Sequence, residues 1–90
     1  MQDVYIENKQ KLQNAIANII REHRLKSKKS ISLLSNEIGM TKSMWADLEK
    51  SIKDPQLSTL WRIAEGLEIP LSSIVKELEK SLGKNFSLIN

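Results

Sequence analysis

The feature that most constrains this 90-residue chain is a helix stop signal followed almost at once by a helix start signal. Residues 31–38 carry helical periodicity behind Ser30, whose hydroxyl is a suitable helix cap. Gly39 ends that segment, because glycine readily adopts the positive φ angle that closes a helix. Thr41 follows and is a good N-cap for another helix over residues 42–50. We therefore expect two short helices joined by a turn of about three residues.

The rest of the chain also has the pattern of helices. Apolar residues recur every three or four positions over residues 8–26, 57–67 and 71–82, which predicts three further helices. No long alternating run of β-branched residues indicates a strand. The predicted fold class is therefore all-α, a compact five-helix bundle.

The length and composition bound the domain organisation. A chain of 90 residues holds one small domain, which we assign to residues 1–90, with a core in residues 12–82 and a C-terminal tail in residues 83–90. No segment approaches the roughly 20 apolar residues of a membrane helix, and the N-terminus lacks a signal-peptide pattern. The chain has no cysteine, which fits a reducing compartment. We expect a cytoplasmic protein without membrane association.

The positive charge is concentrated in the middle of the chain. Residues 21–53 hold eight basic and four acidic side chains, a net charge of +4, whereas the remainder carries −1. A basic segment is often only a solvated surface. Charge therefore needs a matching shape before it indicates nucleic acid.

The two short helices supply such a shape, because their lengths and connection are typical of a helix-turn-helix. The residues spaced to face the interior are Leu34, Ile38, Trp45 and Leu48. The residues left facing outward on the second helix are Lys42, Ser43, Met44, Asp47 and Lys50. A single helix fits the major groove of DNA, where base edges present distinct donors and acceptors. The pattern therefore predicts a recognition helix over residues 42–50.

The outward side chains have chemistry that suits bases or phosphates. Lys42 is a donor for guanine or phosphate, Met44 suits a thymine methyl, and Asp47 is an acceptor for a cytosine amino group. Free N–H groups at the start of the 31–38 helix favour a phosphate. The full set predicted to bind DNA is Ser30, Ile31, Thr41, Lys42, Ser43, Met44, Asp47, Lys50 and Lys53. The alternatives are a core position for Met44 and ordinary surface charges for Asp47, Lys50 and Lys53.

Two segments resemble the Xre/Cro-type, lambda-repressor-like DNA-binding domains. They are the run from Leu34 to Glu49 and the run P-Q-L-S-T-L-W-R-I-A-E-G-L at residues 55–67. The resemblance covers about residues 16–78. It implies a small transcriptional regulator that binds a double-stranded DNA operator in a sequence-specific manner, without a cofactor. It also implies a structural ion pair between Arg24 and Glu49.

The sequence departs from the family pattern at three positions. Ile31 stands where a glutamine usually touches phosphate, which puts that contact in doubt. Ser51 replaces a glycine after the recognition helix, so we expect a looser turn there. Pro70 replaces the small polar cap of the last helix.

An enzyme is not indicated. His23 is the single histidine and lies on the apolar stripe of the first helix, where a packed histidine is the simpler explanation. No phosphate-cradling glycine loop, metal-ligand cluster or small-molecule pocket pattern occurs. The rival hypothesis is a protein-interaction module of the same fold, such as an antitoxin or adaptor subunit. The acidic residues that favour it are Glu65, Glu68, Glu77 and Glu79.

Dimerisation is a further expectation, because one recognition helix reads only a few base pairs and related repressors act as two-fold dimers. The apolar residues predicted to form a homodimer contact are Leu82, Phe86, Leu88 and Ile89, with Leu71 nearby. The alternative is that the tail folds back on its own core. Trp61 either packs on the first helix or contacts another subunit.

Overall fold

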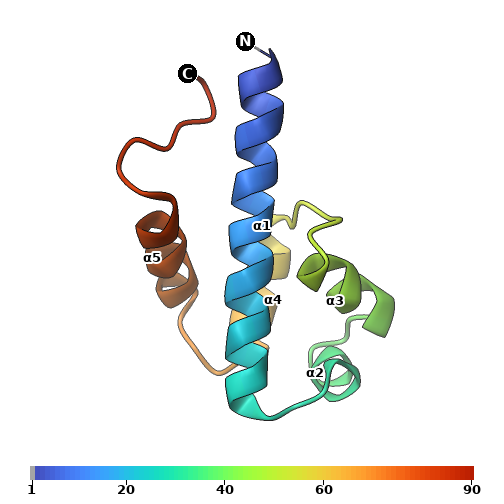
Figure 1. Cartoon of the computed structure of the whole chain (residues 1–90). Helices are drawn as coiled ribbons and strands as arrows, with labels where there is room; N and C mark the ends of the chain where they lie inside the picture. Colours follow the sequence, from blue (N-terminus) through green and yellow to red (C-terminus); the bar gives the residue numbers. More distant parts are fainter. Residues whose placement is uncertain (1) are drawn as a thin grey trace.

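A computed structural model describes residues 2–90 of the chain. Within this range the regular structure consists of α1 (Gln2–Ser27), α2 (Ile31–Glu37), α3 (Lys42–Glu49), α4 (Leu57–Gly66) and α5 (Leu71–Leu82). The long α1 stands at the centre, with α3 and α5 on opposite sides of it (Figure 1). The described residues form no strand. The predicted all-α, five-helix fold is confirmed, and none of the helices in residues 2–90 is long and apolar enough to cross a membrane.

The first helix begins earlier than the sequence pattern predicts. Its start is at Gln2 rather than near residue 8. Val4, Tyr5 and Ile6 are 38%, 45% and 62% exposed, so this part of α1 contributes no buried stripe. A helix propagates easily once its first turns exist, and α1 therefore extends past the residues that pack in the core.

The turn between α2 and α3 forms as predicted. The Ser30 hydroxyl accepts a hydrogen bond from the Leu33 N–H at 3.1 Å, which caps α2. Gly39 has a φ angle of 68°, and the Met40 N–H donates to the Ser35 carbonyl at 2.8 Å, which closes the helix end. Thr41 then caps α3 by accepting from a backbone N–H three residues later at 3.1 Å.

The expectation of a loose turn after α3 is wrong. Ser51 adopts a φ angle of 64°, and the Ile52 N–H donates to the Asp47 carbonyl at 3.0 Å. This is the same helix-closing pattern as after α2, formed without glycine. Pro70 does occupy the cap position of α5, which has no side-chain cap.

The core lies between α1 and the shorter helices. Its largest members with an exposed fraction below 2% are Trp45, Ile20, Leu34, Ile63 and Ile74. The predicted inward residues Leu34, Trp45 and Leu48 are all buried, and Ile38 is partly buried against them. Helix α3 is therefore anchored by its inner side to the centre of the bundle.

The C-terminal tail returns along α1 toward the N-terminus (Figure 1). The Asn8 amide donates to the Ser87 carbonyl at 2.6 Å. Phe86 and Leu88 are half-buried, whereas Ile89 is 84% exposed. This arrangement supports the alternative in which the tail packs on its own chain.

One buried polar group has no partner. The Ser35 side chain in α2 is 2% exposed, and its hydroxyl makes no hydrogen bond to residues 2–90. An unsatisfied buried hydroxyl opposes folding because it loses its hydrogen bonds to water.

We predict that Ser35→Ala raises the free energy of unfolding by about 1–2 kcal/mol, from removal of the stranded hydroxyl and a better helix propensity. Urea unfolding monitored by circular dichroism measures it. The matched control is Ser32→Ala, an exposed serine in the same helix, which gains only the propensity of roughly 0.5 kcal/mol. A Ser35→Ala protein no more stable than the control would contradict the prediction.

Candidate nucleic-acid interface

An ion pair between α1 and α3 fixes the rotation of α3 about its axis. Arg24 Nε and Nη2 donate to the two carboxylate oxygens of Glu49 at 2.6 and 2.9 Å. The side chains are only 15% and 8% exposed. The hydrogen bond to Glu49 raises the pKa of Arg24 above its ordinary value, against the lowering effect of burial. The ion pair that the resemblance implied is confirmed.

The sequence did not reveal a third hydrogen-bond donor to this carboxylate. The Trp45 indole N–H donates to Glu49 Oε2 at 2.5 Å. Trp45 is therefore more than a core residue, because it adds a neutral donor beside the guanidinium. A tryptophan four residues before a glutamate is the local signal that indicates such a contact.

The side chains predicted to lie on the outer face of α3 are accessible to solvent. Lys42, Ser43 and Met44 are exposed, and Asp47 is half-exposed. Met44 keeps 45% of its surface accessible, so the core alternative for this residue is wrong. Met44 also lines an open pocket of about 300 Å³ with Lys53 and Pro55, beside the start of α4.

Uncompensated positive charge surrounds α3. Lys42, Lys50 and Lys53 are exposed, and no carboxylate of residues 2–90 lies within ion-pair distance of any of them. Lys29, by contrast, lies 3.1 Å from Glu37. The basic character of the middle segment is thus carried at this surface by lysines that have no acidic partner among residues 2–90.

The start of α2 fits the predicted contact set less well. The side chain of Ile31 packs against the hydrophobic core, because its position is the first on the inner side of α2. Ile31 is partly buried and apolar, so its side chain offers no donor in place of the glutamine of the family pattern. The hydroxyls of Ser30 and Thr41 are exposed but already accept the capping hydrogen bonds of α2 and α3.

A polar network ties the end of α3 to α1. The Ser51 hydroxyl donates to Asn14 Oδ1 at 2.5 Å, and the Gln10 amide donates to Ser51 Oγ at 3.1 Å. Gln10 also donates to Asn14 at 2.9 Å. These three residues hold the turn that carries Lys50 and Lys53. Nothing in the local sequence indicated this network, since its members lie about 40 residues apart.

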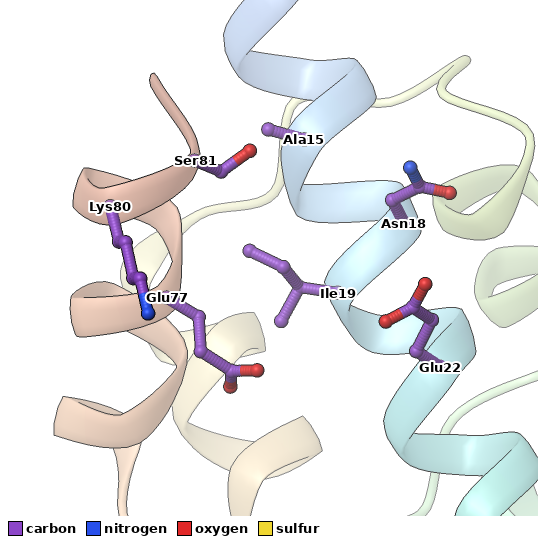
Figure 2. Close-up of a pocket in the computed structure, with 7 residues that line it drawn as sticks. All are labelled: Ala15, Asn18, Ile19, Glu22, Glu77, Lys80 and Ser81. Atoms are coloured by element: carbon purple, nitrogen blue, oxygen red, sulfur yellow. The ribbon is translucent and has the colours of Figure 1, made fainter. Parts of the chain in front are cut away.

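A second pocket, of about 490 Å³, lies between α1 and α5 on the other side of α1 from α3 (Figures 1 and 2). Its walls are Ala15, Asn18, Ile19 and Glu22 from α1 and Glu77, Lys80 and Ser81 from α5 (Figure 2). Glu77 also lies 2.6 Å from His23 Nε2, so the histidine joins α1 to α5. No residue predicted to bind DNA lines this pocket, and residues 2–90 contain no cluster that could hold a metal ion.

Comparison with known proteins agrees with this geometry. The helix-turn-helix family HTH_3 matches residues 20–74, which include α2, α3 and α4. The chain is 37% identical over 46 residues to the HTH-type transcriptional regulator SutR of Escherichia coli K12, covering 51% of this chain and 26% of SutR. It is also similar to the crystal structure of an HTH_3 family transcriptional regulator from Vibrio cholerae, with a TM-score of 0.74 and 27% identity. That match covers 82% of this chain and 42% of the other.

These features define a helix-turn-helix protein. The chain belongs to the HTH_3 family, which confirms the resemblance to lambda-repressor-like domains. The chain spans about a quarter of the length of SutR and less than half of the Vibrio cholerae regulator.

We predict that Glu49→Ala lowers the free energy of unfolding by about 3 kcal/mol, because Arg24 is left buried without its partner. Thermal unfolding should show a melting temperature lower by more than about 10 °C. The control is Glu37→Ala, which breaks the more exposed pair with Lys29 and should cost less than about 1 kcal/mol. Equal losses in the two variants would contradict the prediction.

For Ser51 we predict that the alanine and glycine variants differ. Ser51→Ala loses the bonds to Asn14 and Gln10 and keeps the left-handed strain, which destabilises the protein by about 1 kcal/mol. Ser51→Gly loses the same bonds but relieves strain of about 1 kcal/mol, so its stability stays close to that of the parent. Urea midpoints compare the two; equal midpoints would show that the strain is negligible.

Proposed function

We propose that this chain binds duplex DNA in a sequence-specific manner as part of a transcriptional regulator, with α3 in the major groove. The observation that carries the proposal is the outer face of α3. It combines exposed polar and apolar side chains with unpaired lysines, on a helix held by a buried ion pair. The names of both relatives, each a transcriptional regulator, support this reading over an antitoxin or adaptor subunit.

We assign the residues of this surface to two kinds of DNA contact, base edges and phosphates. Lys42, Ser43, Met44 and Asp47 lie at the N-terminal and middle positions of α3, the part of a recognition helix that meets base edges. Lys50 and Lys53 contact phosphates on one flank, and Ser30 lies beside the DNA backbone on the other. Phosphate contacts supply affinity and register, whereas the residues on α3 supply the choice of sequence. A protein with this role acts in the cytoplasm of a bacterial cell.

A homodimer completes the proposal, since one recognition helix covers too few base pairs for a selective site. The tail contact is less suitable than expected, because Phe86 and Leu88 are half-buried against their own chain. Trp61 is 57% exposed and borders an apolar groove of about 640 Å³ between α4 and α5. Leu71 and Val75 line the same groove. We propose that a second copy covers this face, with each Trp61 entering the groove of the other copy.

Salt dependence tests the DNA contact. The logarithm of the binding constant should fall linearly with the logarithm of salt concentration, with a slope of about −0.9 for each phosphate contact. Lys50→Gln and Lys53→Gln should each make the slope less steep by up to about one unit. Fluorescence anisotropy with a labelled duplex measures these slopes.

The control for charge is Lys76→Gln, which removes an exposed lysine on α5 and should leave the slope unchanged. Equal effects from Lys76→Gln and Lys50→Gln would indicate a diffuse electrostatic attraction and would contradict the assignment of the DNA-binding surface to α3 and the turn after it.

For the dimer, we predict that Trp61→Glu reduces the sedimenting mass to that of one chain, because a buried carboxylate opposes the contact. Ile89→Glu places the same charge on the 84% exposed tail residue and should leave the mass unchanged. A monomeric Ile89→Glu variant, together with a dimeric Trp61→Glu variant, would contradict the proposed Trp61 interface and would place the dimer contact at the C-terminal tail.

A further inference from the structure

One arginine outside the DNA-facing surface holds the turn between α2 and α3. Arg62, on α4, directs its Nη2 atom to the carbonyl oxygens of Ile38 and Gly39, at 2.7 and 2.8 Å. A guanidinium Nη atom carries two N–H groups, so one donor is available for each carbonyl. No backbone N–H of residues 2–90 donates to either oxygen outside the helices. Arg62 therefore supplies the partner that these two carbonyls need.

The same face of α4 also contacts the apolar side of the turn. A Cβ atom added to Gly66 would lie 2.6 Å from Cγ2 of Ile38, so the absence of a side chain at Gly66 allows α4 to approach. Arg62 and Gly66 are four residues apart and lie on one side of the helix. Ile38 is consequently held at its carbonyl by Arg62 and at its side chain by the backbone of α4.

The position of this turn sets the direction in which α3 leaves α2. Ile38 and Gly39 end α2, and α3 begins three residues after Gly39. The positive charge of Arg62 also suits the C-terminal end of α2, where the carbonyl dipoles point outward. Arg24 and Glu49 hold the other end of α3. The recognition helix is thus fixed at both ends, by α1 near its C-terminus and by α4 at the turn before its N-terminus.

We propose that Arg62 is a positioning residue that controls sequence discrimination without touching DNA. This inference rests on the proposed function, because it concerns how α3 is presented to bases. Base contacts require donors and acceptors in one geometry, whereas lysine–phosphate attraction depends weakly on distance and angle. A looser turn before α3 should therefore weaken binding to a preferred sequence more than binding to an unrelated duplex.

The test compares two duplexes at one salt concentration, a sequence that the wild-type chain enriches from random DNA and an unrelated duplex of equal length. Arg62→Met keeps the aliphatic part of the side chain and removes the donors. Its preference for the selected duplex should fall roughly fivefold or more, equivalent to the loss of one good base contact. Affinity for the unrelated duplex and the salt slope for that duplex should stay unchanged.

Two further variants separate positioning from charge and from stability. Arg62→Lys keeps the charge and places its N–H donors on a single nitrogen, and it should recover part of the preference. Arg21→Met removes an exposed arginine of α1 and should leave the preference intact. All measurements are made well below the melting temperature of each variant, so that the fraction of folded protein does not differ.

The outcomes distinguish this inference from the function on which it rests. A wild-type chain that enriches no sequence would overturn the proposed function. A wild-type chain with a clear preference that Arg62→Met retains would overturn the role of Arg62 alone. A parallel fall in affinity for both duplexes, with a less steep salt slope, would make Arg62 a phosphate contact and would also overturn the inference.

Discussion

The orientation of the outer face of α3 depends on the hydrogen bonds that the carboxylate of Glu49 accepts. It accepts two hydrogen bonds from Arg24 on α1 and one from the indole of Trp45 on its own helix. Rotation of α3 about its axis would separate Glu49 from Arg24 while both charges remain largely buried, at a cost of several kcal/mol. The pair therefore fixes which side chains of α3 face outward. The exposure of Lys42, Ser43 and Met44 is a direct consequence.

The surrounding helices maintain this arrangement with side-chain hydrogen bonds to the two turns that flank α3. Arg62 satisfies two carbonyls at the end of α2, and Ser51 holds the turn after α3 through Asn14. Ser51 and Glu68 both adopt positive φ angles without being glycine. Such residues are strained, and they persist where neighbouring structure holds them. The bundle thus supports α3 at its two ends and leaves its outer face free of intramolecular partners.

Local signals in the sequence were sufficient to predict the helix-turn-helix. Gly39 and the capping hydroxyls of Ser30 and Thr41 interact with backbone groups only a few residues away. Their effect can therefore be predicted from a short stretch of sequence. The start of α1 was missed because residues 2–7 have no apolar stripe to bury. The contacts of Arg62 and Ser51 were missed because they join residues more than 20 positions apart and leave no periodic pattern. The DNA contact predicted at Ile31 stays a prediction, and the packing of its apolar side chain against the core leaves its backbone N–H to make it.

The most direct test of the account is selection of duplexes from random sequence at one fixed salt concentration, with the wild-type chain and with Asp47→Ala. We expect a two-fold symmetric motif with half-sites about one helical turn apart. Asp47→Ala should change the preferred bases within each half-site and leave the spacing unchanged, because Asp47 is on the outer face of α3. No enrichment by the wild-type chain, or an identical motif for both proteins, would contradict the claim that α3 reads DNA through this face.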